Sequence, residues 1–415
     1  MNETAAISEQ LKAAMPHTTR YPQLGTGSID VEPMVSAELF EIERERIFKR
    51  VWLKVGRVEE IPEPGDYKVK RLEVAHTSAI IVRGKDGEIR AFHNICTHRG
   101  NKLVPGTSDE TFGHAQAHLL SCRFHAWTFT TEGALRGVPR QEAFDNLDKS
   151  CLGLKPIHCD VWEGFIFLNL DDQPRWTLTE YLGGIGEHCA GFPYHEATAA
   201  YRYSTVLDCN WKVCMHAFAE GYHVPTIHQN TLPSLAKIEH ADFKIYGPHC
   251  NSALYVLGLD QMEPTPATGK LGGLLKMSDL HGPRLQEMPD SMNAQRRDDL
   301  QFEWPVFFPN MLLHVCAGNG YPGMVYFHHQ FWPISVGKTL WEGTNFYRPP
   351  RTPSERIAIA HTTALHRNAW LEDTGTMEDT YEALLSGVLK EMPLMDEEFM
   401  VRHVHQQWHE FMDTP

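Results

Sequence analysis

Two cysteine–histidine pairs constrain this chain more than any other feature. The stretch "ICTHRGNK" places Cys96 two positions before His98, and "SCRFHAW" places Cys122 three positions before His125. Each pair follows or precedes a predicted strand, and thiolates and imidazoles are both good metal ligands. If the pairing is not a coincidence, two loops of one small domain meet at a metal centre, and each loop supplies one sulfur and one nitrogen.

The mixed arrangement of the ligands bears on which metal they hold. Two thiolates and two imidazoles suit tetrahedral zinc, and a structural zinc site is the main alternative. Zinc fingers, however, group the two cysteines together and the two histidines together. One sulfur and one nitrogen per loop suit a [2Fe–2S] cluster in which the cysteines hold one iron and the histidines the other. Neutral imidazoles raise the potential of such a cluster, which makes it an electron relay.

The surrounding sequence predicts a small all-β domain over residues 49–170. Short runs rich in β-branched and aromatic residues recur there, punctuated by Gly, Pro, Asp and Asn. These runs are "YKVKRLEV", "SAIIVR", "EIRAF", "WTFTTEG" and "GFIFLNL". Residues 1–48 are expected to be an N-terminal segment with a helix that packs on the domain of residues 171–415. A helix is predicted over residues 41–54, where apolar residues recur near helical spacing.

Residues 171–415 mix helical and extended patterns, so the fold class as a whole is α+β. Amphipathic helices are predicted over 355–372 and 396–412, and strands within 305–318 and 323–335. Residues 264–300 have little periodicity and are expected to form a long surface loop, a type that often serves as a lid or binding loop.

The composition excludes several classes of function. The formal charge is −15, so the chain lacks the excess of lysine and arginine that binds nucleic acid or anionic membranes. No apolar run reaches membrane-spanning length, and the first 20 residues do not resemble a signal peptide. Nine cysteines, an odd number, suit reduced thiols, some of them ligands, and a cytoplasmic location.

A second group of candidate ligands lies in "NWKVCMHAFAEGYHVPTIH", residues 210–228. His223 and His228 are five positions apart, which on a regular helix separates them by roughly 140°. Pro225 lies between them and is expected to end or bend the helix. The two imidazoles converge only if the chain turns after His223; otherwise they are ordinary histidines at a helix end.

"CTHRG" and "CRFHAWTF", in this order, resemble the Rieske motif of the α (terminal oxygenase) subunits of bacterial ring-hydroxylating oxygenases. The resemblance implies a Rieske domain followed by a catalytic domain with a central antiparallel sheet and helices, of the START-like helix-grip type. It implies four cluster ligands, which are Cys96, His98, Cys122 and His125. It also implies that Trp127 covers the cluster.

One departure from the family's pattern lies between the two Rieske loops. Twenty-three residues separate His98 from Cys122, a longer gap than the family leads us to expect. The extra residues are expected to form a surface insertion. Its histidines, His114 and His118, are expected to be solvated loop residues rather than ligands.

The same resemblance assigns residues to a mononuclear Fe²⁺ site. The family pattern E/D-x-Y-H-x-x-x-x-H matches His223 and His228, and a later aspartate completes a two-histidine, one-carboxylate set that leaves positions open for O₂ and substrate. Asp379, in "GTMEDTYEALLSGVL", occupies the matching place. Its rivals are Glu372, Asp373 and Glu378.

Three further residues around this site have expected roles. In the family, a carboxylate at the position of Glu220 is not a ligand but bridges electron transfer from the cluster of a neighbouring subunit. Tyr222 is expected to fix the hydrogen bonding of the ligands. His216 stands where many relatives carry asparagine, which leaves the hydrogen bonding around Glu220 open.

The resemblance implies an oxygenase that takes electrons from NAD(P)H only indirectly, through a flavin reductase and often a ferredoxin. A homotrimer is implied, with or without a small β subunit. Apolar residues near Phe218, 250–262 and 306–318 favour an aromatic substrate and a cis-dihydrodiol or phenol product. The alternative is a monooxygenase or demethylase acting on a C–H bond beside an amine or ether, such as that of a quaternary ammonium compound. A pure electron carrier or a zinc-stabilised protein is more remote.

Overall fold

The computed structural model describes residues 16–106, 109–229, 231, 240–255, 288–297, 299–316 and 324–414. The chain divides into two compact units, one of residues 42–181 and the other of residues 1–41 with 182–415. The unit that contains both cysteine–histidine pairs spans residues 42–181, and the sequence predicts a domain over 49–170 in this part of the chain.

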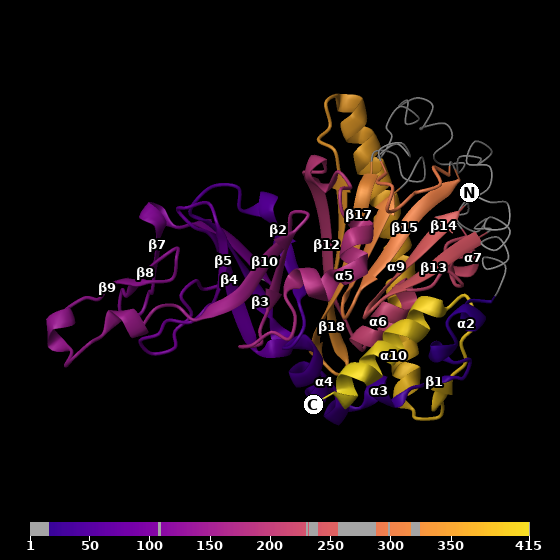
Figure 1. The fold of residues 1–415 in the computed structure, drawn as a ribbon, viewed down its shortest axis with the longest axis horizontal. Coiled ribbons are helices and arrows are strands. Elements are labelled where there is room, and N and C mark those ends of the chain that lie inside the picture. The colour runs from indigo at the N-terminus through magenta and orange to yellow at the C-terminus, as the bar shows by residue number, and fades with distance from the viewer. Residues whose placement is uncertain are drawn as a thin grey trace. The chain divides into compact units, whose positions relative to one another are not determined.

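The unit of residues 42–181 is built on two antiparallel sheets (Figure 1). In sheet order, the seven strands of the larger one are β2 (Leu53–Arg57), β11 (Phe165–Asn169), β10 (Pro156–Trp162), β5 (Ile89–His93), β4 (Thr77–Arg83), β3 (Asp66–Leu72) and β6 (Glu110–His114). The smaller sheet consists of β7 (Leu119–Ser121), β8 (Thr128–Thr130) and β9 (Leu135–Gly137). Each run predicted to be extended contains a strand, because alternating apolar residues such as Ile80 and Val82 face a shared core.

Two local predictions differ in part from the structure. The helix predicted over 41–54 is confirmed only as far as Phe48: it begins earlier, as α4 (Ala37–Glu43), and continues as a π-helical segment, Arg44–Phe48. The chain is extended from Leu53 because β2 pairs with β11 there. His114 is not a loop residue, because β6 pairs with β3 and the His114 Nδ1 atom lies 2.8 Å from Asp66 Oδ1.

Strand β6 also brings a carboxylate onto two lysines of β3. Glu110 Oε1 lies 2.8 Å from Lys68 Nζ and 3.3 Å from Lys70 Nζ, and both lysine side chains are buried. Burial acts to raise the pKa of Glu110, but the charges of Lys68 and Lys70 outweigh it and lower that pKa to about 2. An ion-pair cluster therefore ties the segment between the two cysteine–histidine loops to the sheet.

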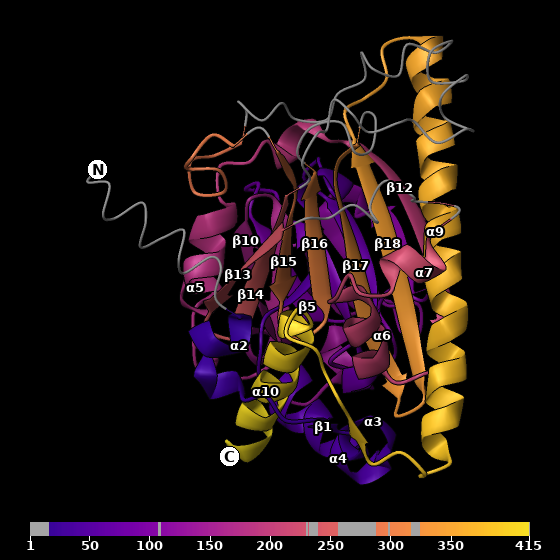
Figure 2. The same ribbon diagram turned by 90° about the vertical axis from the view of Figure 1, so that its right-hand side faces the viewer.

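The other unit is built on a seven-stranded antiparallel sheet (Figure 2). In sheet order the strands are β12 (Ala199–Leu207), β18 (Lys338–Tyr347), β17 (Met324–Ser335), β16 (Met311–Cys316), β15 (Leu300–Phe307), β14 (His249–Tyr255) and β13 (His240–Tyr246). Strands predicted within 305–318 and 323–335 are confirmed. A two-stranded sheet pairs β1 (Ile29–Asp30) with β19 (Glu391–Met392).

Helices cover one face of this sheet. Figure 2 shows α6 (Trp211–Phe218), α7 (Val224–Ile227) and α10 (Phe399–Asp413) in front of it, and α9 (Pro353–Leu385) running its length beside β18 and β12. Both predicted C-terminal helices are confirmed, although α9 extends well beyond 372. It starts sharply because Thr352 caps the Glu355 backbone N–H and a proline occupies the first turn.

The remaining helices are short, except for α5, whose residues include the boundary between the two units at 181/182. They are α2 (His17–Arg20), α3 (Glu32–Val35), α5 (Leu178–Cys189) and 3-10 turns at Pro22–Leu24, Val58–Glu60, Glu73–Ala75, Gln116–His118, Gln141–Ala143, Lys149–Cys151 and Tyr194–Glu196. Of the surface loop predicted over 264–300, residues 264–287 and 298 lie outside the described part. Residues 288–297 form turns and bends, and β15 begins at Leu300.

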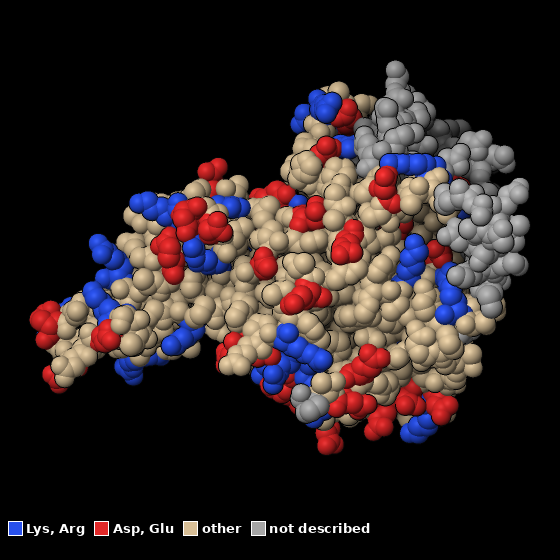
Figure 3. Space-filling model, viewed as in Figure 1, with Lys and Arg blue, Asp and Glu red and all other residues tan. Residues whose placement is uncertain are grey.

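Acidic and basic side chains are interspersed on the face shown in Figure 3. The described residues on that face form no broad basic patch. Among the helices described here, none combines the length and the apolar character that crossing a bilayer requires.

Candidate functional site

The two cysteine–histidine loops lie together in the unit of residues 42–181. Cys96 and His98 follow β5, and Cys122 and His125 occupy the turn between β7 and β8. The two thiols are within hydrogen-bonding contact, and the two imidazole rings lie edge to face with their centroids 4.6 Å apart. Two sulfurs and two imidazole nitrogens thus converge from two loops.

The surroundings of these four side chains fit a bound cluster. The His98 Nδ1 atom is buried and has no hydrogen-bond partner among the described residues, as expected of an unused ligand atom. Asn101 Nδ2 lies 3.7 Å from Cys122 Sγ, and backbone N–H groups also point at both sulfurs. The Trp127 ring stacks on the His98 ring at 4.7 Å and is buried, so it shields the nitrogen side of this group.

The second group of ligands forms because the chain turns between His223 and His228. Helix α6 ends at Phe218, and Pro225 does not end a helix but lies in the first turn of the short helix α7, which begins at Val224 and where a missing N–H costs nothing. His223 precedes this turn and His228 follows it. Their ring centroids lie 5.2 Å apart, so this turn brings both imidazoles to one place.

The carboxylate that joins them is Asp373, not the predicted Asp379. Asp373 Oδ1 lies 3.0 Å from His228 Nε2 and 3.5 Å from His223 Nε2. Asp379 is exposed, because six residues along α9 rotate it about 120° away from the face that carries Asp373. Adjacent ligand atoms about 2.1 Å from one metal lie about 3.0 Å apart, so this spacing fits a metal with open positions.

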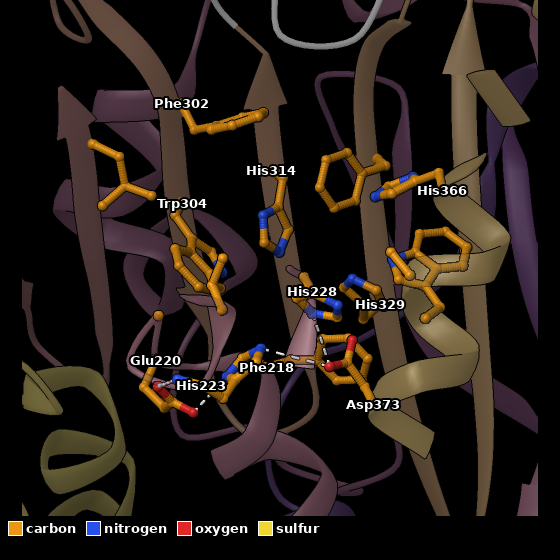
Figure 4. Close-up of a pocket in the computed structure, with 16 residues that line it drawn as sticks. Phe218, Glu220, His223, His228, Phe302, Trp304, His314, His329, His366 and Asp373 are labelled. Carbon is orange, nitrogen blue, oxygen red and sulfur yellow. Dashed lines mark hydrogen bonds and ion pairs between the residues drawn. The ribbon is translucent and has the colours of Figure 1, made fainter. Parts of the chain in front are cut away.

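A further carboxylate contacts the Nδ1 atom of each histidine, and the Nε2 atom of each faces Asp373. Figure 4 shows the contact of Glu220 with His223 and the approach of both imidazoles to Asp373. Glu220 Oε1 lies 2.6 Å from His223 Nδ1, and Glu372 Oε2 lies 2.8 Å from His228 Nδ1. Burial opposes protonation of His228, but Asp373 and Glu372 outweigh it and raise its pKa. Carboxylates on Nδ1 fix the tautomer that presents Nε2 to a metal.

The structure also describes the surroundings of Tyr222 and His216, the two other residues expected near Glu220. The Tyr222 residue is 69% exposed, and it is its backbone N–H, not its phenol, that contacts Glu220. Tyr222 therefore contacts the group behind His223 through its main chain, by way of Glu220. His216 does not contact Glu220 in any interaction described; its Nε2 atom is buried without a partner among the described residues, and burial lowers its pKa to about 3.

A pocket opens over the His223, His228 and Asp373 side chains. Its other walls come from α6, α7, α9 and strands β14 to β17: Phe218, Glu220, Gly221, Val224, Leu254, Phe302, Trp304, His314, Phe327, His329, His366, Ala369 and Trp370. Alternate residues of β15 and β17 face it, as strand geometry requires. Part of the predicted lining is present, since Phe218, Leu254 and His314 lie in the segments expected to form the pocket.

Three histidines in this lining, His314, His329 and His366, were not predicted from the sequence. Burial lowers the pKa of all three, to about 3 for His366 and well below the ordinary value for the other two. They are therefore uncharged near neutral pH. The available signal was strand alternation, which puts His329 on the same face as Phe327.

Comparison with known proteins agrees with this geometry. The family model described as "Ring hydroxylating alpha subunit (catalytic domain)" matches residues 194–414, and the one described as "Rieske [2Fe-2S] domain" matches residues 51–152. The first covers more than half of the chain. Each match contains one of the two groups of candidate ligands.

Two curated relatives and one solved structure are similar to the chain. The carnitine monooxygenase oxygenase subunit of Acinetobacter pittii is 31% identical over 46% of this chain and 50% of its own length. The 2-aminobenzenesulfonate 2,3-dioxygenase subunit alpha of an Alcaligenes species is 36% identical over 45% and 46%. A quaternary ammonium Rieske monooxygenase in complex with L-carnitine shares the fold, with a TM-score of 0.71 at 20% identity over 93% of this chain and 96% of that one.

The chain spans about half the length of these two curated relatives. Proteins with these two domains carry a [2Fe–2S] cluster and a mononuclear iron, and they receive electrons from a partner protein. The chain belongs to the family of Rieske ring-hydroxylating oxygenase α subunits.

Proposed function

We propose that this chain is the terminal oxygenase of a Rieske monooxygenase system that hydroxylates a C–H bond next to the nitrogen of a small quaternary ammonium compound. One oxygen atom of O₂ enters the C–H bond and the other leaves as water, with two electrons from NAD(P)H and two protons. The hydroxylated carbon then loses its bond to nitrogen: the C–N electron pair stays on nitrogen, the hydroxyl proton is released to solvent, and an aldehyde and a tertiary amine result. The curated relative that acts on carnitine supports this choice over an aromatic substrate.

The observation that carries the proposal is the wall of the pocket, which is rich in aromatic rings and has no lysine or arginine among the described lining residues. Three phenylalanines and two tryptophans line the pocket: Phe218, Phe302, Trp304, Phe327 and Trp370. The described lining residues include no lysine or arginine, and of the five histidines the three that are not candidate metal ligands, His314, His329 and His366, are uncharged. Ring faces attract a desolvated ammonium group through cation–π interactions, whereas an anion would find no counter-charge in these walls.

The cluster, in this proposal, is held by Cys96, His98, Cys122 and His125, with Trp127 packed on His98. The orphaned His98 Nδ1 atom and the contact between the two thiols support this assignment. The cluster would supply single electrons, while the protein's part is to bury the sulfurs and hydrogen-bond to them, both of which tune the potential.

His223, His228 and Asp373 would hold the mononuclear iron, which when bound activates O₂. Glu220 and Glu372 orient the two imidazoles, and the apolar pocket excludes bulk water from the substrate. Glu220 is further proposed to link His223 to the cluster of a neighbouring subunit in a homotrimer. A flavin reductase, with or without a ferredoxin, would supply electrons in the cytoplasm; a small β subunit is a further candidate partner.

An aromatic substrate is the second candidate. The pocket walls are mostly apolar, which suits a planar ring as well, and the relative named for 2-aminobenzenesulfonate acts on one. On this alternative the product is a cis-dihydrodiol or a phenol.

Turnover with a surrogate reductase tests the choice. The purified holoenzyme, NADH and O₂ are incubated with glycine betaine, choline, carnitine, benzoate or toluene. The proposal predicts an aldehyde and a tertiary amine in one-to-one ratio with NADH, from one or more of the ammonium compounds. A dihydrodiol or phenol from the aromatic compounds, with no amine released, would refute it.

A further inference from the structure

The histidine His314 has no part in holding either metal centre, yet it lies in the wall of the pocket. It projects from β16, and the ring is sandwiched between Phe327, at 4.2 Å and 15°, and Trp304, at 4.8 Å and 36°. Two aromatic neighbours leave the imidazole little freedom to rotate. Figure 4 shows the ring hanging into the pocket on the side of His228.

The Nε2 atom of His314 has no hydrogen-bond partner among the described residues, and the whole residue is 8% exposed. Buried polar atoms are almost always satisfied, so an unpaired one in a pocket wall points to a ligand that satisfies it. The ring is uncharged, because burial and the neighbouring histidines hold its pKa well below the ordinary value. It therefore offers a neutral hydrogen-bonding group, not a cation.

The two other histidines of the wall already use a ring nitrogen. His329 Nδ1 accepts a hydrogen bond from Trp341 Nε1 at 3.1 Å. His366 Nδ1 donates one to Asn345 Oδ1 at 2.8 Å. His314 is thus the member of the three with a buried ring nitrogen known to be unpaired among the described residues.

The residues around the pocket restrict which functional group of a substrate could form a hydrogen bond with His314 Nε2. A hydroxyl both donates and accepts, so it satisfies either tautomer of a neutral imidazole. A carboxylate would require the Nε2–H tautomer and would bury a negative charge that no lysine or arginine of the described lining offsets. A quaternary ammonium group has no N–H and cannot serve.

We propose that His314 is a specificity-determining residue that positions the substrate through a hydrogen bond between its Nε2 atom and a hydroxyl group of the substrate. The inference rests on the proposed function for the ammonium group, which the aromatic rings bind. The preferred substrate is then a small quaternary ammonium compound with a hydroxyl close to the nitrogen.

The test compares two ligands that differ only in the hydroxyl. Dissociation constants of choline and ethyltrimethylammonium are measured anaerobically on the holoenzyme by tryptophan fluorescence, since Trp304 and Trp370 line the pocket. The wild type is expected to bind choline about tenfold more tightly. His314→Phe keeps a ring between Trp304 and Phe327 but removes both nitrogens, and should bring the ratio to within about twofold by weakening choline alone.

One further variant distinguishes a hydrogen bond from ring packing. One further ligand, glycine betaine, distinguishes a substrate hydroxyl from a substrate carboxylate. His314→Gln, which restores a polar group near Nε2, should recover part of the preference for choline. An unchanged ratio in His314→Phe, or equal weakening of both ligands, overturns the role of His314. Glycine betaine binding more tightly than choline in a His314-dependent way overturns the hydroxyl in favour of a carboxylate.

Failure of the proposed function gives a different pattern. In that case neither ammonium compound binds the wild type, whereas phenol or toluene does. The phenol-to-toluene ratio then tests His314 by itself: its loss in His314→Phe supports the hydroxyl contact, and its persistence overturns it.

Discussion

Replacing Glu372 with glutamine should weaken iron binding without touching a proposed ligand. Its Oε2 atom accepts hydrogen bonds from His228 Nδ1 at 2.8 Å and from Thr231 Oγ1 at 2.6 Å. A hydrogen bond to a charged group contributes about 1.5–3 kcal/mol, and the Glu372 side chain is 29% exposed, so solvent screening reduces this to about 1–2 kcal/mol. That free energy corresponds to a loss of about tenfold in iron affinity, within the range known for carboxylates behind ligand histidines.

The assay titrates Fe²⁺ against a chelator of known affinity, with the absorbance of the cluster as an internal standard for protein integrity. Glu378→Gln is the matched control, because this glutamate lies on the same helix but accepts a hydrogen bond from the backbone of Asp208. We expect Glu372→Gln to lose about tenfold and Glu378→Gln to match the wild type. Equal affinities in all three proteins would refute the role of Glu372, and so would a loss of cluster absorbance in proportion to the loss of iron.

Three further predictions concern the ligands and the stability of the two units. Asp373→Asn should remove the mononuclear iron but keep the cluster, whereas Asp379→Asn should keep both; the reverse result in iron analysis would restore Asp379 as the ligand. The pKa of Glu110 is lower in the folded chain than in the unfolded one, so its stabilisation is complete above about pH 4.5 and is lost as the pH falls toward 2. Urea midpoints should therefore fall less steeply over this pH range in Glu110→Gln than in the wild type, and equal slopes would show that the ion pairs do not stabilise the fold. His188→Leu should lower the free energy of unfolding by about 3 kcal/mol, because it leaves the buried Glu303 carboxylate, now 3.0 Å from His188 Nε2, without that partner; an unchanged urea midpoint would count against the pair.

Local patterns predicted much of the fold. The strands of the unit with residues 42–181 have apolar residues on alternate positions, and each predicted run was located to within a few residues. The helix expected over 41–54 ends at Phe48 instead, because Val51 and Trp52 have helical spacing but are buried where the chain enters β2. Pairing with β11, which is distant in sequence, outweighed the local pattern there.

In the candidate site, too, residues close together in sequence could be predicted, whereas residues selected by tertiary packing could not. The two cysteine–histidine loops and the His223–His228 pair were readable because each ligand lies close to its partner in sequence. The carboxylate was not, since α9 carries Glu372, Asp373, Glu378 and Asp379 within eight residues. The phase of the helix against the sheet selects among them, and that phase is a tertiary property. The three pocket histidines, His314, His329 and His366, were not predicted because they come from three separate elements, β16, β17 and α9.

The measurement that tests the two-centre assignment most directly is the metal and sulfide content of the purified chain, combined with an EPR spectrum after dithionite reduction. Two independent centres predict roughly three irons and two acid-labile sulfides per chain, with the spectrum of a histidine-ligated [2Fe–2S] cluster. Roughly two irons with sulfide, unchanged after incubation with Fe²⁺, would contradict the site at His223, His228 and Asp373. Zinc without sulfide would contradict both centres and the oxygenase function with them.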